Sequence, residues 1–280
     1  MNYRHAYHAG NFADVMKHTA LIAALDYLAK KDKPFRVIDT HAGRGLYDLS
    51  GHEAVRTREA QTGVARLGAA AGMPDALRRY AEVAGSFGAD RYPGSPLIAQ
   101  RVLRLKDRLV AIERHAEEYE ALATALKPYA NARTIQGDGY ARLAALLPPP
   151  ERRGLVLIDP PYEAEDEFAR AGEAFAAAWQ RFATGVILIW LPIKRRADAD
   201  ALAGEIRSRS GAKLLLLTLD VGRPPDTPPE RLSQCGLLVA NPPYGFDDTM
   251  RAMLAYLAEH LAQGPGASWR VDALSASADL

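Results

Sequence analysis

The chain alternates between short apolar runs and longer stretches in which apolar residues recur at helical spacing. Most of the short runs are apolar without alternation, which is typical of strands buried on both faces of a parallel sheet. They predict seven strands, at residues 35–39, 109–113, 133–136, 155–158, 186–191, 214–219 and 235–241. Helical stretches separate these strands, so the pattern predicts an α/β fold with a mostly parallel seven-stranded sheet.

Residues 1–18 form a polar, histidine-rich start that leads into the first predicted helix. Gly10-Asn11 is typical of a helix start, and apolar residues at helical spacing continue toward Pro34. Two interpretations remain open for this segment. It is either an exposed arm or a segment facing the substrate, in which Arg4 meets phosphates and Tyr3 or Tyr7 stacks on a base.

Residues 47–92 interrupt the alternation of strands and helices. They are rich in alanine and arginine and poor in β-branched residues, which predicts a small helical insertion after the first strand. Its arginines either face RNA or belong to a solvated helix surface. A new helix is predicted directly afterwards, with Ser95 as its N-cap and Pro96 at its first position.

Four carboxylates follow four of the predicted strands. Asp39 and Glu113 end the first two, and Asp138 and Asp159 come after the next two. The carboxyl ends of parallel strands meet at the edge of the sheet where ligands bind, so we expect these acids in one line across one site. Gly43 lies in the turn after the first strand, where a glycine lets the backbone approach a ligand closely.

Composition narrows the class of protein only slightly. A formal net charge of +1 over 280 residues neither requires nor excludes nucleic acid, because a basic face can be balanced elsewhere. The one cysteine, Cys235, lies in an apolar run, which predicts a buried thiol and fits a cytoplasmic protein without disulfides. No apolar run approaches the ~20 residues that cross a bilayer. We expect no membrane partner, no metal and a monomer.

The run at residues 155–158 leads directly into Asp159-Pro160-Pro161-Tyr162. The two prolines fix φ and remove two backbone donors, so the strand must end there. Asp159 is thereby held at the carboxyl end of a central strand. This stretch resembles the Asp/Asn-Pro-Pro-aromatic motif of amino methyltransferases that use S-adenosylmethionine.

Other segments make the resemblance more specific and extend it over nearly the whole chain. The chain resembles the bacterial 23S ribosomal RNA adenine-N6 methyltransferase J family. The residues that carry this resemblance are Tyr3-Arg4-His5, His8-Ala9-Gly10-Asn11, Asp14, Lys17-His18, Asp39-Thr40-His41-Ala42-Gly43 and Pro93-Gly94-Ser95-Pro96. The resemblance implies a single Rossmann-like class I methyltransferase domain over residues 1–280. It also implies S-adenosylmethionine as cofactor and N6-methylation of one adenosine in 23S ribosomal RNA as the reaction.

The resemblance implies roles for individual residues as well. Asp159 is the expected catalytic acid, with Pro160 and Tyr162 beside it. Tyr3 is expected to touch the RNA, and we group Arg4, His5 and Lys17 with it on the substrate side. Cofactor contacts are expected at His18, His41, Ser95, Glu113, Asp138 and Gly139, to which the turn after the first strand adds Asp39 and Gly43.

The chemistry required of Asp159 follows from the target. The exocyclic amine of adenine is a poor nucleophile because its lone pair is delocalised into the ring. Asp159 and the carbonyl of Pro160 would accept its two hydrogens and aim the lone pair at the methyl group. The same carboxylate would take the proton, while Tyr162 would stack on the flipped base.

Asn241-Pro242-Pro243-Tyr244 is a second copy of the motif at the end of the last predicted strand. We favour Asp159 because an aspartate can accept a proton and because its strand lies beside the glycine turn.

Two other functions stay open. The enzyme could act on DNA adenine or a protein glutamine, although a 46-residue insertion is small for a DNA-recognition domain. A non-catalytic RNA-binding protein on the same scaffold is the second alternative.

Overall fold

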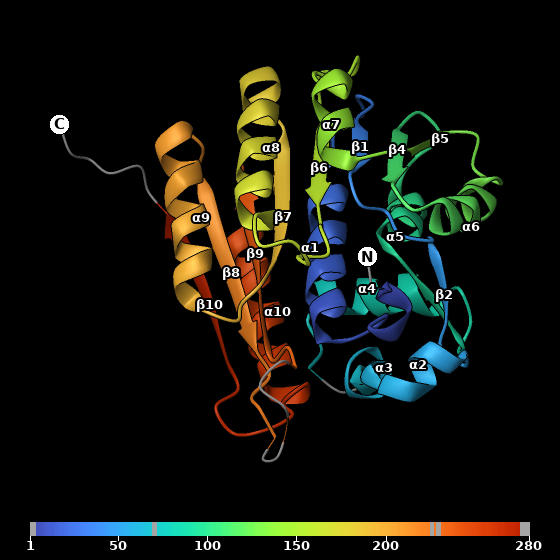
Figure 1. Ribbon diagram of the computed structural model, residues 1–280, viewed down its shortest axis with the longest axis vertical. Helices are drawn as coiled ribbons and strands as arrows, with labels where there is room; N and C mark the ends of the chain where they lie inside the picture. The colour runs from blue at the N-terminus through green and yellow to red at the C-terminus, as the bar shows by residue number, and fades with distance from the viewer. Residues whose placement is uncertain (1–3, 69–71, 225–226, 228–230, 275–280) are drawn as a thin grey trace.

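The computed structural model describes residues 4–68, 72–224, 227 and 231–274. An eight-stranded sheet forms its centre, in the order β10-β8-β9-β7-β6-β1-β4-β5 (Figure 1). Its strands are β1 Arg36–Asp39, β4 Arg108–Glu113, β5 Ala132–Gln136, β6 Gly154–Ile158, β7 Val186–Pro192, β8 Leu214–Asp220, β9 Gln234–Ala240 and β10 Ser268–Leu274.

Most neighbouring strands of this sheet are parallel. β5, β4, β1, β6 and β7 run in one direction, whereas β9 is antiparallel to β7 and β8, and β10 is antiparallel to β8. All seven predicted strands are therefore present and adjacent. The prediction of a seven-stranded sheet is corrected by β10, an edge strand in which apolar and polar residues mix, so that it lacks the apolar run that marks a buried strand.

Helices fill the connections between strands. They are α1 Phe12–Ala29, α2 His52–Thr57, α3 Glu59–Thr62, α4 Asp75–Gly85, α5 Ser95–Val102, α6 Ala116–Leu126, α7 Gly139–Leu143, α8 Glu167–Phe182, α9 Arg196–Arg209 and α10 Phe246–His260. Three short 3-10 helices, η1 His5–Tyr7, η2 Val64–Arg66 and η3 Ala144–Leu146, accompany them.

Two apolar layers hold the sheet between helices. In β6, Leu155 and Leu157 pack toward α1 and α10, while Val156 and Ile158 pack toward α8 and α9 (Figure 1). This placement explains the unbroken apolar run in the sequence, because side chains on both faces are removed from water. The strand that carries Asp159 is therefore fixed from both sides.

α1 is buried around most of its circumference. Asn11 caps its start by accepting the backbone N–H of Asp14 at 3.0 Å, as predicted from Gly10-Asn11. The helix packs against the sheet and against α4, α5 and α10. A helix without a solvated face can carry a charged residue only where that residue has a partner, which makes its buried charges informative.

The segment predicted as a helical insertion contains α2, α3, η2 and α4. A two-stranded ribbon, which the apolar pattern did not predict, closes it at its ends: β2 (Leu46–Asp48) pairs antiparallel with β3 (Arg91–Pro93). At the following helix the predicted cap is wrong by one residue. Gly94 is the N-cap of α5, and the hydroxyl of Ser95 donates instead to a carboxylate of the site.

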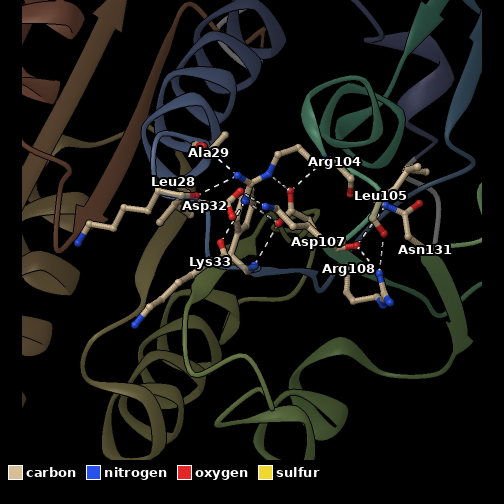
Figure 2. A network of polar contacts seen from close by, with 12 residues as sticks. Leu28, Ala29, Asp32, Lys33, Arg104, Leu105, Asp107, Arg108 and Asn131 are labelled. Carbon is tan, nitrogen blue, oxygen red and sulfur yellow. Dashed lines mark hydrogen bonds and ion pairs between the residues drawn. The ribbon is translucent and has the colours of Figure 1, made fainter.

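At the amino ends of the strands, a polar network ties the end of α1 to the segment before β4 (Figure 2). The guanidinium of Arg104 pairs with Asp107 at 2.8 Å and also donates to the carbonyls of Ala29, Lys31 and Lys33. Burial alone would raise the pKa of Asp107, but hydrogen bonds from Arg104 and from backbone N–H groups lower it. The network fixes the far end of α1.

Two further expectations concern burial and the membrane. Cys235 is fully buried, its Sγ lies 3.5 Å from the sulfur of Met16, and burial raises the pKa of its thiol, so the predicted buried thiol is confirmed. None of the helices in the described part of the chain is both long and apolar enough to cross a membrane.

Candidate active site

A cavity of about 990 Å³ opens at the carboxyl edge of the parallel strands. The sheet order β6-β1-β4-β5 places the four predicted acids in one line: Asp159, Asp39, Glu113 and Asp138. The predicted row of carboxylates is thus confirmed. Three of them line the cavity directly, whereas Asp39 lies behind its wall.

Glu113 is held in the cavity wall by two backbone donors. Its Oε2 accepts the N–H of Gly43 at 2.9 Å and its Oε1 accepts the N–H of His115 at 2.7 Å. Gly43 has φ +62°, in the left-handed region that favours glycine. The carboxylate is therefore fixed in orientation, and each oxygen keeps a second lone pair for a pair of ribose hydroxyls.

Asp138 marks the other end of the row. It caps α7 through the N–H groups of Tyr140 and Ala141, and Arg170 donates to its Oδ2 at 3.2 Å. Burial would raise the pKa of Asp138, but these hydrogen bonds and nearby arginines lower it. Gly139 has no room for a side chain, because a Cβ would collide with the carbonyl oxygen of Thr40. The glycine thus lets the start of α7, and with it Asp138, pack directly against the backbone that follows β1.

Asp39 reaches the cavity only through Ser95. Its Oδ2 accepts the hydroxyl of Ser95 at 2.6 Å, and Ser95 lines the cavity. Burial raises the pKa of Asp39 to about 7, with the charge of Asp159 acting in the same direction. Asp39 thus fixes a neighbouring side chain, and its predicted direct contact with a cofactor stays a prediction.

Two histidines, the buried His18 and the partly buried His41, line the cavity in their neutral form. Burial lowers the pKa of His18 to about 3 and that of His41 to about 4. The Nδ1 of His18 lies 2.8 Å from the hydroxyl of Tyr92, and His41 packs edge-on against Tyr140. Neutral imidazoles do not repel a positively charged ligand, so both can adjoin a sulfonium.

Asp159 forms an ion pair with Lys17, 142 residues away in sequence. The Nζ of Lys17 lies 2.5 Å from its Oδ2 and 3.0 Å from Oδ1 of Asp14. Only 4% of Lys17 is exposed, and the two carboxylates hold its pKa well above the usual value in spite of burial. Lys17 therefore cannot meet a phosphate at the surface, and its predicted RNA contact does not fit this position.

Asp14 joins this ion pair to the N-terminal segment. Its Oδ2 accepts the N–H of Gly10 at 2.9 Å and contacts Nε2 of His5 at 2.9 Å. Burial would raise its pKa, but His5 and Lys17 hold it well below the usual range. The segment predicted to face the substrate thus ends on the same charged cluster as Asp159.

Tyr162 lies against an aromatic wall on the other side of Asp159. Its hydroxyl donates to the carbonyl of Trp190 at 2.7 Å, and its ring packs against Phe168 and Trp190. The residue has φ +50°, a strained conformation for a tyrosine that Pro160-Pro161 and these contacts maintain. The ring is therefore fixed at the cavity wall, where a flat base can stack.

The second copy of the motif lies at the opposite edge of the sheet. Because β9 is antiparallel to β7, its last residue Ala240 pairs with Ile187 near the start of β7. Asn241 donates its side-chain N–H to Ala183 and Gly185 there, and Tyr244 is 92% exposed. Because β9 runs opposite to β7, Asn241 lies at the amino edge of the parallel strands, away from the cavity that Asp159 lines.

The remaining predicted substrate residues lie around the cavity mouth. Arg4 is exposed and lies 3.8 Å from Glu117, and His5 lines the cavity beside Tyr47. Tyr3 lies outside the described residues. Within the described part of the chain, no group of three or more His, Cys, Asp or Glu side chains is placed to hold a metal ion.

No role was predicted from the sequence for Asp14 or Trp190, and the ion pair between Lys17 and Asp159 was missed. Asp14 resembles any acid in the first turn of a helix, and the Lys17 contact crosses most of the chain. Trp190 carried a detectable signal, since it is a bulky aromatic near the end of the strand beside β6.

The donor set fits S-adenosylmethionine. Glu113 suits the ribose hydroxyls, Asp138 beside Gly139 suits the adenine, and neutral His18 and His41 tolerate the sulfonium. The cavity volume is also in the range of small-molecule sites.

Comparison with known proteins agrees with this geometry. The family described as Ribosomal RNA large subunit methyltransferase D, RlmJ, matches residues 32–274. Ribosomal RNA large subunit methyltransferase J of Escherichia coli K12 is 38% identical over 261 residues, covering 92% of each chain. The protein of the same name from Haemophilus influenzae is 36% identical, covering 97% of this chain and 98% of its own.

A solved structure supports the same relationship. Protein LPL1258 from Legionella pneumophila superimposes with a TM-score of 0.86 and 34% sequence identity, covering 97% of this chain and 99% of its own. The fold is the Rossmann-like methyltransferase fold, with a mostly parallel sheet and helices on both faces. With matches this extensive in sequence and in structure, the chain belongs to the RlmJ family of ribosomal RNA large subunit methyltransferases.

Proposed function

We propose that this protein transfers a methyl group from S-adenosylmethionine to the N6 amine of one adenosine in 23S ribosomal RNA. The observation that carries the proposal is that Asp159 and Glu113 open into one cavity, which joins a proton acceptor to a ribose-binding carboxylate. We take large-subunit ribosomal RNA as the substrate because the chain belongs to a family of ribosomal RNA large subunit methyltransferases. We infer that the protein acts in the cytoplasm.

We also propose an organisation for the chain. Residues 1–280 act as one methyltransferase domain and a monomer, residues 47–92 act as its insertion, and residues 1–18 act as the segment facing the substrate. The contacts of His5 and Gly10 with Asp14 support the last assignment.

The carboxylate of Asp159 has one oxygen available for the target amine. Lys17 occupies Oδ2, while Oδ1 has no hydrogen-bond partner in the described part of the chain. Oδ1 would accept one amine hydrogen and the carbonyl of Pro160 the other, which directs the nitrogen lone pair away from both acceptors. Lys17 keeps the carboxylate in this orientation.

Bound S-adenosylmethionine supplies a methyl group activated by a positively charged sulfur. As the amine attacks, its nitrogen becomes positive, and the nearby Asp159 carboxylate stabilises that charge and takes the proton. Tyr162 would hold the flipped base by stacking, which helps offset an unstacking cost of a few kcal/mol. The neutral imidazoles of His18 and His41 add no opposing charge.

A methyl-transfer assay with labelled S-adenosylmethionine tests the proposal. We expect transfer to 23S ribosomal RNA and none to double-stranded DNA or to a protein with an accessible glutamine. Asp159→Ala should abolish transfer while cofactor binding by calorimetry remains. Asn241→Ala, the matched change at the opposite edge, should leave transfer intact, and the reverse result would move the catalytic role to Asn241.

A further inference from the structure

The charges around the cavity mouth are distributed unevenly. Six lysine or arginine side chains line the cavity, and four of them lie within 4.0 Å of a carboxylate: Arg4, Lys17, Arg114 and Arg170. The other two, Lys194 and Arg231, are exposed and form no ion pair within the described part of the chain. These two side chains therefore keep their full charge toward solvent.

The paired cations share one half of the mouth with an excess of acids. Seven carboxylates line that half, at the ends of β4, β5 and β6 or on the connections that follow them: Glu113, Glu117, Glu118, Asp138, Asp159, Glu163 and Glu167. A strand of phosphates placed there would meet net negative charge and be repelled. This half suits the hydroxyls and adenine of the cofactor but not a polyanion.

Lys194 and Arg231 come together on the other half from adjacent strand ends. Lys194 follows β7 by two residues, and Arg231 precedes β9. The N–H of Ile193 donates to the carbonyl of Gln234 at 3.0 Å, which ties the two segments to each other.

Neighbouring groups extend this positive half. Arg223, also exposed, donates to the carbonyl of Arg231 at 3.3 Å. The nearby acid Glu59 is already bonded to His8 and Asn11. Burial would raise the pKa of Glu59, but the hydrogen bonds and charge of His8, the hydrogen bond of Asn11 and the charge of Arg231 lower it. The side chain of Arg231 is nevertheless exposed to solvent.

This half also adjoins the expected target base. The carbonyl of Trp190 on β7 accepts the hydroxyl of Tyr162, and Lys194 follows on the same segment. A base stacked on Tyr162 would leave its ribose and phosphates at the mouth of the cavity beside Lys194. We propose that Lys194 and Arg231 bind the RNA phosphates that flank the target adenosine, so that the strand crosses the ends of β7 and β8. This inference rests on the proposed function.

Charge reversal tests the inference. The double variant Lys194→Glu/Arg231→Glu is compared with Arg181→Glu/Arg207→Glu, which changes the net charge equally at the far ends of α8 and α9. RNA binding is measured by filter retention of a 23S ribosomal RNA fragment over a series of salt concentrations. Cofactor affinity is measured by calorimetry, and methyl transfer gives KM and kcat separately.

Only the first double variant should weaken RNA binding, on the order of tenfold or more at 0.1 M salt, with the salt slope reduced by about 2. Its KM for RNA should rise while cofactor affinity stays the same. Equal losses in both variants, no loss in either, or a parallel loss of cofactor affinity would overturn the inference. If the wild-type protein methylates no RNA, the proposed function is wrong. The filter-retention measurement then still shows whether Lys194 and Arg231 bind RNA phosphates, because it measures RNA binding without methyl transfer.

Discussion

Replacing Lys17 with methionine is the most direct test of the charged cluster behind the active site. Methionine keeps much of the length and volume of the side chain but removes its positive charge. Among the described residues, Asp14, which is 1% exposed, then keeps His5 and one backbone N–H as partners, and Asp159 keeps no ion pair. The variant therefore leaves buried negative charge without compensation.

The size of the effect follows from this burial. Removing one partner of a buried ion pair costs about 3–5 kcal/mol, because the remaining charge stays desolvated. Asp14 retains two partners and Asp159 faces the cavity, so we expect about 3 kcal/mol, at the low end of that range. Lys17→Met/Asp14→Asn should recover about half of the loss, because the buried carboxylate has been neutralised as well.

Urea unfolding followed by circular dichroism measures this difference. Lys30→Met serves as the control at the C-cap of the same helix, because Lys30 is exposed and its Nζ lies 5.5 Å from the ring centroid of Tyr27. Its loss should stay below about 1 kcal/mol. A similar small loss for Lys17→Met, or no recovery in the double variant, would refute the reasoning that the charges of Lys17 and Asp14 are both buried and mutually compensated.

Three further variants test other parts of the structure. Because the pKa of Asp39 is raised from 3.8 to about 7, the free energy of unfolding should fall as pH rises from 4 to 8, by up to about 4 kcal/mol. In urea unfolding over this pH range, the Asp39→Asn variant should lose this contribution to the pH dependence. Arg104→Ala should cost about 3 kcal/mol by leaving Asp107, which is 0% exposed, without its partner, whereas Arg108→Ala should cost below about 1 kcal/mol. Tyr162→Phe should keep methyl transfer within a few fold because the ring remains, and Tyr162→Ala should raise the KM for RNA by about tenfold through lost stacking.

The fold could be predicted because its strands are buried on both faces. An unbroken apolar run followed by a polar turn marks such a strand without knowledge of its neighbours, as residues 155–158 show. β10 and the ribbon of β2 and β3 gave no such signal. They lie at an edge or outside the main sheet, where polar side chains are tolerated and strand identity depends on the partner.

The candidate site could be predicted in part for a related reason. Asp39, Glu113, Asp138 and Asp159 all follow strands, and the topology of a parallel sheet brings strand ends together. The role of Lys17 could not be predicted this way. A lysine in an amphipathic pattern normally faces water, and only the packing of α1 against the sheet shows that it points inward to Asp159.

The network at the end of α1 has a mechanical consequence for the reaction centre. Lys17 and Ala29 lie 12 residues apart on one continuous helix, a distance of about 18 Å. At the amino edge of the sheet, Arg104 donates to the carbonyl of Ala29 at the end of the helix. At the carboxyl edge, Lys17 near the start of the helix donates to Asp159. Substitutions that remove the contacts of Arg104 would let α1 move along its axis. Such a movement would displace the ammonium of Lys17 from Asp159 and slow methyl transfer, although the substituted residue lies far from the cavity.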